Sequence, residues 1–136
     1  NLDNMLRITK YFNNFSLFSG SDSLALKVCQ RGGAGAITAC SNISGKLLNY
    51  IINNYKKESE IKNFQLLQQL QEQIRKTLLL HEPISALKAF LSVTNNNENW
   101  NKVNPPLIKI LHPKDHKTVM SLIELIKKMD ELLPSA

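Results

Sequence analysis

The chain has 136 residues and a formal net charge of +6, which bounds it to one domain at most. Its basic residues are scattered over several predicted helices, without an arginine-rich cluster or interleaved aromatic residues, so we predict no nucleic-acid partner. No apolar run approaches the roughly 20 residues that span a membrane, and no signal-peptide pattern opens the chain, so we predict no membrane partner. The two cysteines are typical of a reducing compartment, which indicates a cytoplasmic protein.

The first predicted element is an amphipathic helix over residues 2–12, whose apolar side chains recur at helical spacing, and residues 13–14 are expected to end it. Residues 15–18, FSLF, form an apolar run that is too short for a helix and predicts a strand. A polar turn follows this strand. Either Ser21 or Asp22 is expected to cap the next helix by accepting hydrogen bonds from its free N–H groups.

The next predicted helix is about two turns long, with Leu24, Leu26, Val28 and Cys29 on its apolar side, and Gly32-Gly33 ends it, where a left-handed residue is needed. Residues 34–39, AGAITA, predict a second, buried strand whose small side chains suit a crowded interior or the close approach of a ligand. Residues 40–42 form a second polar turn. The whole segment predicts a βαβ unit of a parallel sheet, and in parallel α/β folds the turns after the strands hold the active site.

The remainder of the chain is predicted to be almost entirely helical. The apolar periodicity predicts further helices over residues 43–55, 61–80, 84–93 and 114–132. Pro83 is expected to separate the second of these helices from the third. The long helix and the C-terminal helix are expected to carry subunit contacts as well, with Leu67 and Leu70 of the long helix as the residues to test.

Two adjacent parallel strands cannot bury both of their faces without neighbouring strands. The strand expected before the first helix is not in the chain, and 136 residues are too few for a whole (β/α)8 barrel, which needs roughly 250. We therefore expect more sheet to be supplied upstream or by another polypeptide. Because the first residue is Asn1 rather than Met, the chain is expected to be a fragment or a processed product. The predicted fold class is α/β, mostly helical.

Three landmarks occur in order over nearly the whole chain: NLDN at residues 1–4, FSGSDSLALKVCQRGGAGAITACSNI at residues 18–43, and ISALKAFL followed by NPPLIKI between residues 84 and 110. The first resembles the residues just after the Schiff-base lysine strand of the dihydrodipicolinate synthase and N-acetylneuraminate lyase family, the pyruvate-type class I aldolases. The second is similar to the family's seventh strand, seventh helix and eighth strand. The third resembles its C-terminal helices and proline segment.

The resemblance implies the C-terminal part of a (β/α)8 TIM barrel, with the last two strands in residues 1–55 and a C-terminal helical extension in residues 56–136. It implies part of a Schiff-base-forming class I lyase or synthase that acts on pyruvate or a 2-keto-3-deoxy acid, usually as a homotetramer, without metal or cofactor. Neither predicted strand contains a lysine, so the resemblance places the catalytic lysine upstream of Asn1. No catalytic residue is expected in this chain, and the upstream half of the barrel would be its partner.

Four substrate-binding residues carry over from the family's pattern. Gly20 matches the glycine that lets the chain approach the substrate, and Ile37 matches the apolar residue beside the imine. Ser21 and Asp22 fall where members contact the distal part of the substrate, although a helix cap remains an equal alternative for Asp22. Ser23 stands where sialate lyases carry Glu, which counts against sialic acid, and the sequence G-S-D is closer to 2-keto-3-deoxy sugar-acid aldolases. The 2-keto acid and the direction of the reaction stay open.

A noncatalytic helical interaction module is the alternative function. The long helix at residues 61–80 and the basic charge favour it. The strand ends discriminate between the two classes, because an interaction module gives no reason for a Gly20-Ser21-Asp22 turn beside a bare Ala-Ile-Thr-Ala strand.

Overall fold

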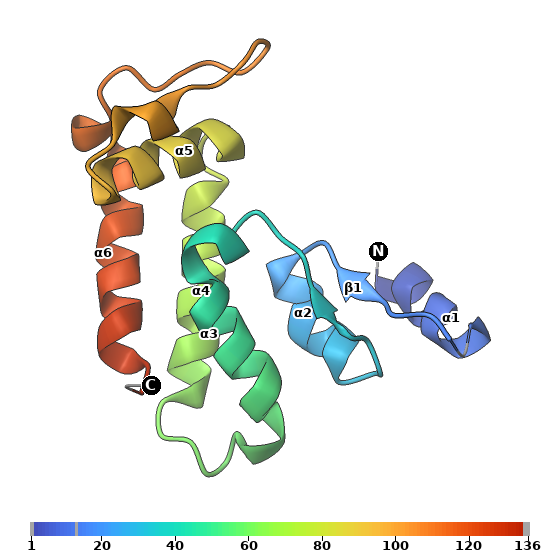
Figure 1. The fold of residues 1–136 in the computed structure, drawn as a ribbon. Coiled ribbons are helices and arrows are strands. Elements are labelled where there is room, and N and C mark those ends of the chain that lie inside the picture. The colour runs from blue at the N-terminus through green and yellow to red at the C-terminus, as the bar shows by residue number, and fades with distance from the viewer. Residues whose placement is uncertain (1, 13, 135–136) are drawn as a thin grey trace.

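The computed structural model describes residues 2–12 and 14–134, so Asn1 of the NLDN landmark and Asn13 of the expected Asn13-Asn14 helix end lie outside the described residues. A small βαβ part projects to one side of a larger helical part, and the sequence runs from the first to the second (Figure 1). In chain order the helices and strands are α1 (Leu2–Tyr11), β1 (Phe18–Ser19), α2 (Asp22–Cys29), β2 (Gly35–Ala36), α3 (Ser41–Asn54), α4 (Phe64–Leu78), α5 (Pro83–Thr94) and α6 (Lys117–Leu132). Short 3-10 helices lie at Tyr55–Lys57, Glu98–Asn101 and Pro113–Asp115.

The predicted βαβ unit is confirmed. Strands β1 and β2 pair in parallel, with Phe18 opposite Gly35 and Ser19 opposite Ala36. The Ile37 N–H continues the ladder by donating to the Ser19 carbonyl at 2.9 Å. One face of this pair packs on α2, where Ala25 and Val28 are fully buried. The sheet therefore has one covered face.

Both strands are shorter than the sequence predicts, and the expectation that residues 34–39 form a buried strand is wrong. Strand geometry covers only two residues in each strand, with one further hydrogen bond at each end of the pair. Ile37 is 73% exposed, and Phe18 is also exposed on the face away from α2. Burial of a strand needs a layer on both sides, and in the described part of the chain only one side has a layer.

The helical part is built around one hydrophobic core. Helices α3, α4 and α6 lie side by side, and α5 crosses one end of them (Figure 1). The predicted long helix is α4, and Leu67 and Leu70 on its apolar side are 2% and 1% exposed. They pack against residues of α3, α5 and α6, including Leu47, Phe90 and Leu122. Leu67 and Leu70 are therefore not available for a subunit contact, because both side chains are buried within the chain itself. Subunit contacts through other residues of α4 and through α6 stay a prediction.

Helices α3, α4 and α6 begin two to three residues away from their predicted starts. Helix α3 begins at Ser41 and contains a kink at Ser44, whose φ of −123° and ψ of 21° are not helical. Helix α4 begins after Asn63, which adopts the left-handed conformation with φ of 69°. Helix α6 begins at Lys117, since the 3-10 turn at Pro113–Asp115 takes the residues before it. Asparagine tolerates the left-handed region, so Asn63 can end the preceding loop sharply.

Glu82 caps α5, directly before Pro83 at the first helical position. Its carboxylate accepts hydrogen bonds from the N–H groups of Ser85 at 2.7 Å and Ile84 at 3.2 Å. Burial acts to raise the pKa of Glu82, but the hydrogen bonds from Ser85 and Ile84 and the charge of His81 outweigh it, so the pKa lies below its ordinary value. The folded state is thus stabilised by the ionised carboxylate.

We expect Glu82→Ala to lower the free energy of unfolding by about 1 kcal/mol at pH 7, the usual cost of losing a cap. Since the folded pKa is depressed, this stabilisation is complete above the ordinary carboxyl pKa of 4.5 and disappears as the pH falls through the folded value. Urea unfolding measured between pH 3 and pH 7 checks both points. Glu82→Gln keeps an acceptor and serves as the control. An equal difference between wild type and Glu82→Ala at every pH would contradict the account.

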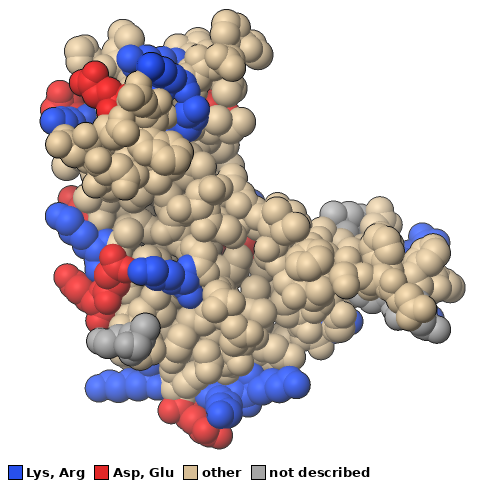
Figure 2. All heavy atoms as spheres, viewed as in Figure 1, with Lys and Arg blue, Asp and Glu red and all other residues tan. Residues whose placement is uncertain are grey.

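The surface carries charge of both signs without one dominant patch on the face shown. Lys and Arg side chains lie in separate groups with Asp or Glu beside several of them, and much of that face carries neither (Figure 2). Within residues 2–12 and 14–134, no helix combines the length and the apolar character needed to cross a bilayer.

Candidate functional site

The carboxyl ends of β1 and β2 bring together the two polar turns named from the sequence. Ser19 ends β1 and is fully buried, and Gly20 follows it at the surface. The Ser19 hydroxyl donates to the Ser21 carbonyl at 2.8 Å and accepts from the Ser21 N–H at 3.2 Å. This local pair of bonds fixes the turn that leads into α2.

The Asp22 carboxylate connects three elements of the structure. Its Oδ1 accepts hydrogen bonds from the Thr38 hydroxyl at 2.8 Å and from the Gln71 side-chain amide at 3.2 Å. Thr38 lies just after β2 and also shares a 2.8 Å hydrogen bond with the Ser41 hydroxyl at the start of α3. Asp22 therefore ties the turn after β1 to the end of β2 and to α4.

Neither residue expected to cap α2 does so with its side chain. Ser21 occupies the cap position with extended backbone angles, but its side chain makes no capping hydrogen bond. The Ser21 and Ser23 hydroxyls instead share a hydrogen bond at 3.0 Å. The capping alternative for Asp22 is wrong as well, because its carboxylate points to Thr38 and Gln71. A contact between Asp22 and a substrate stays a prediction.

Ile37 lies on the other side of the sheet from this network. Side chains alternate along a strand, so Ile37 shares the open face with Phe18 and Gly35, whereas Thr38 faces the helices. Gly20 also leaves open space, since no atom lies within 4 Å of where a Cβ would stand. Ile37 and Gly20 can therefore meet a molecule that lies over the open face, and Asp22 is turned toward the helical layer.

Cys40 sits beside this network without acting as a nucleophile. Burial raises the pKa of its thiol to about 12, and the neighbouring Asp22 carboxylate contributes to the increase against the opposite effect of Arg75. Burial also raises the pKa of Cys29. Both thiols are therefore biased toward the protonated, unreactive form, with Cys40 buried and Cys29 half-buried.

Sequence reasoning missed Thr38, Ser44 and Gln71. Thr38 carried a usable signal, because it is the polar residue at the carboxyl end of the second predicted strand. Gln71 carried none, since it lies among several glutamines of one helix. In the structure Gln71 is only 5% exposed, whereas Gln69 on the same helix is exposed.

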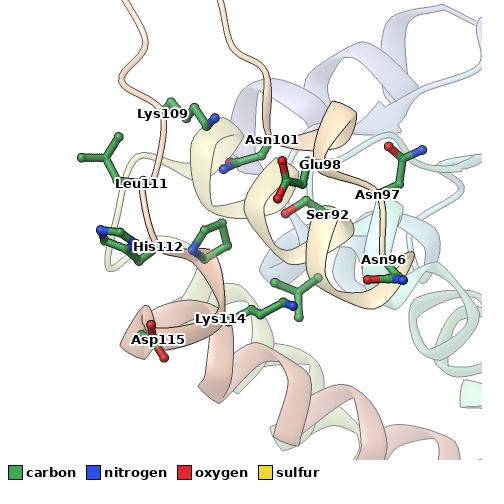
Figure 3. A pocket seen from close by; sticks show the side chains of 12 residues that line it. Ser92, Asn96, Asn97, Glu98, Asn101, Lys109, Leu111, His112, Lys114 and Asp115 are labelled. Carbon is green, nitrogen blue, oxygen red and sulfur yellow. The ribbon is translucent and has the colours of Figure 1, made fainter.

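A second polar hollow, of about 360 Å³, lies at the far end of the helical part from the sheet. Glu98 and Asn101 from one 3-10 helix and Lys109 from the segment opposite point toward this hollow (Figure 3). Asn101 closes its base by donating to the Ile110 carbonyl at 2.8 Å. No strand end contributes to it. Among the residues that the structure describes, no three His, Cys, Asp or Glu side chains gather closely enough to hold a metal ion.

The combination of a parallel βαβ unit, polar turns at its strand ends and a helical C-terminal part defines a piece of a parallel α/β enzyme fold. The chain belongs to the dihydrodipicolinate synthetase family, whose model matches residues 1–126. It is 36% identical over 52 residues to the 4-hydroxy-tetrahydrodipicolinate synthase of Staphylococcus epidermidis, a match that covers 38% of this chain and 18% of that enzyme. The resemblance drawn from the sequence is thereby confirmed.

Solved structures of this family share the fold. The dihydrodipicolinate synthase of Bacillus anthracis superposes with a TM-score of 0.74 at 20% identity, covering 99% of this chain and 43% of that chain. The N-acetylneuraminate lyase of Fusobacterium nucleatum, solved with pyruvate, gives 0.71 at 23% identity, covering 97% of this chain and 42% of the lyase. A monomeric dihydrodipicolinate synthase variant gives 0.70 at 20% identity, covering 97% and 42%. The chain thus spans less than half the length of these barrels.

Proposed function

We propose that the chain is the C-terminal part of a Schiff-base-forming class I lyase or synthase acting on pyruvate or a 2-keto-3-deoxy acid. Residues 1–55 would supply the last two strands of the barrel, and residues 56–136 its C-terminal helical extension. The observation that carries this proposal is the open face of the β1–β2 pair, where Ile37 is 73% exposed at the carboxyl end of a strand. Membership of the family supports it.

In this proposal the open face is the barrel interior, and the upstream half of the barrel covers it. A lysine preceding Asn1 would attack the keto carbon, and loss of water would give the imine. A strand in an apolar interior suits this nucleophile, since desolvation lowers the pKa of an amine and frees its lone pair. The protonated imine then accepts the electron pair as the bond at the substrate's C3 breaks or forms.

The residues of this chain would bind and shape the substrate. We propose that Ile37 packs beside the imine and excludes water, and that Gly20 lets the substrate approach the backbone. Ser21 and Asp22 would border the distal part of the substrate, with Asp22 also holding the turn through Thr38. A cytoplasmic homotetramer is the proposed assembly. The interaction-module alternative loses its main support, because the apolar side of α4 is buried in the core.

We expect Ile37→Glu to weaken pyruvate binding at least tenfold in the intact polypeptide that carries this chain, because the new carboxylate would stand beside the carboxylate of the ligand. Titration calorimetry with pyruvate measures the effect. Ile108→Glu, at a site that is 79% exposed and distant from the strand ends in sequence, is the control and should bind as wild type does. Equal affinity of wild type and Ile37→Glu would contradict the proposed position of the substrate.

A further inference from the structure

The Gln71 side chain joins α4 by hydrogen bonds to the turn after β1 and to the first turn of α3. Its side-chain Nε2 donates to Asp22 Oδ1 at 3.2 Å and to the Ser44 hydroxyl at 3.1 Å. Asp22 opens α2 after β1, and Ser44 forms the kink of α3 after β2. Ser44 in turn donates to the Cys40 carbonyl at 3.2 Å. One amide nitrogen thus joins the segments that follow both strands.

The orientation of the Gln71 amide is fixed by the groups around it. Rotating the amide by half a turn would place its oxygen against the Asp22 carboxylate, a contact between two acceptors. In the observed orientation Oε1 is buried without a hydrogen-bond partner. Leaving a buried acceptor unpaired costs free energy. The two hydrogen bonds donated by Nε2 therefore determine the orientation of the amide, and Oε1 is left without a hydrogen-bond partner.

Open space lies beside Asp22 on the side of α4. Asp22 and Gln71 both border a hollow of about 320 Å³ between α2, α3 and α4. A carboxylate beside open space can rotate once its donors are removed. The hydrogen bonds, rather than neighbouring side chains, are what keep Asp22 directed toward the helical layer.

We propose that Gln71 is a positioning residue, which from α4 holds the Asp22 turn and the α3 kink in one arrangement, so that the helical extension sets the geometry of the segments that follow β1 and β2. This inference rests on the proposed function for the role of the turns. It gives the helical extension a role in the geometry of the proposed site.

Amide hydrogen exchange in the intact polypeptide tests the inference without relying on activity. The Ser21 N–H bonds to the Ser19 hydroxyl and the Leu24 N–H bonds to the Ser21 carbonyl, so both report on the turn. Loss of a hydrogen bond to a charged group predicts that Gln71→Leu speeds the exchange of these two amides roughly tenfold to hundredfold. Exchange within α6 should stay at the wild-type rate.

Two further variants separate positioning from general stability. Gln69→Leu makes the same change at an exposed position of α4 and should leave the turn unaffected. The double variant Asp22→Asn with Gln71→Glu re-forms the bond with donor and acceptor exchanged, and should restore slow exchange. Unchanged exchange at Ser21 and Leu24 in Gln71→Leu would overturn the inference, and so would an equal acceleration throughout the chain. Failure of wild type to bind pyruvate would overturn the proposed function instead.

Discussion

Leu70→Ala is expected to lower the free energy of unfolding by about 3 kcal/mol, within the 2 to 5 kcal/mol that such truncations of buried leucine cost. Leu70 is 1% exposed and belongs to the core formed by α3, α4, α5 and α6. Removing its three terminal carbons takes away buried apolar surface and leaves a cavity. The surrounding helices relax only partly, so the cavity does not close. Urea unfolding followed by circular dichroism measures the change.

The control for this prediction is Leu80→Ala. Leu80 lies just past the end of α4 and is 78% exposed, so its loss should change the free energy of unfolding by less than about 0.5 kcal/mol. A similar effect of the two substitutions would mean that the apolar side of α4 is not buried within the chain. In that case the apolar side of α4, including Leu67 and Leu70, would again be a candidate for subunit contacts.

Gly33→Ala is expected to cost about 2 to 3 kcal/mol, the upper part of the range for inserting a methyl group into a packed site. A Cβ on Gly33 would lie 2.3 Å from Val28 Cγ1 and 2.9 Å from the Val28 carbonyl oxygen. The side chain of Val28 is fully buried and the carbonyl belongs to the backbone of α2, so neither can move away freely. The turn between α2 and β2 must therefore open.

Gly45→Ala makes the same chemical change with the opposite expected sign. Its Cβ would meet only the Ser41 Cβ, at 3.9 Å, which is an ordinary contact. Alanine is favoured over glycine inside a helix by about 1 kcal/mol, so this variant should be more stable than wild type. Thermal unfolding of the two variants side by side tests the pair. Destabilisation by both would contradict the reading of Gly33 as a steric position.

The sequence predicts the helices well because their signal is local. The spacing of apolar residues locates α4 and α6 to within three residues, and Pro83 correctly marks the start of α5. The strands are predicted less well. Whether Ile37 is buried depends on which strands lie beside it, and that information is not contained in residues 34–39.

The same distinction explains the candidate site. The polar turn that holds Gly20, Ser21 and Asp22 is predicted locally, because it follows a strand, whereas its contacts with substrate are what the family resemblance implies. The partner that decides where the Asp22 carboxylate points is Gln71, which is 49 residues away in the chain. The sequence around Asp22 predicts a capping role, because it contains no sign that a side chain of another helix donates a hydrogen bond to the Asp22 carboxylate. Thr38, by contrast, could have been included on the same local argument as Asp22.

The central claim is that this chain belongs to a protein that forms an imine with pyruvate on a lysine outside residues 1–136. Borohydride reduction of the intact polypeptide in the presence of pyruvate, followed by mass spectrometry of the peptides, tests it directly. The account predicts one pyruvate adduct, on a lysine that precedes Asn1, and none on the lysines of this chain. Absence of an adduct on any peptide, or an adduct on a lysine within the chain, would contradict it.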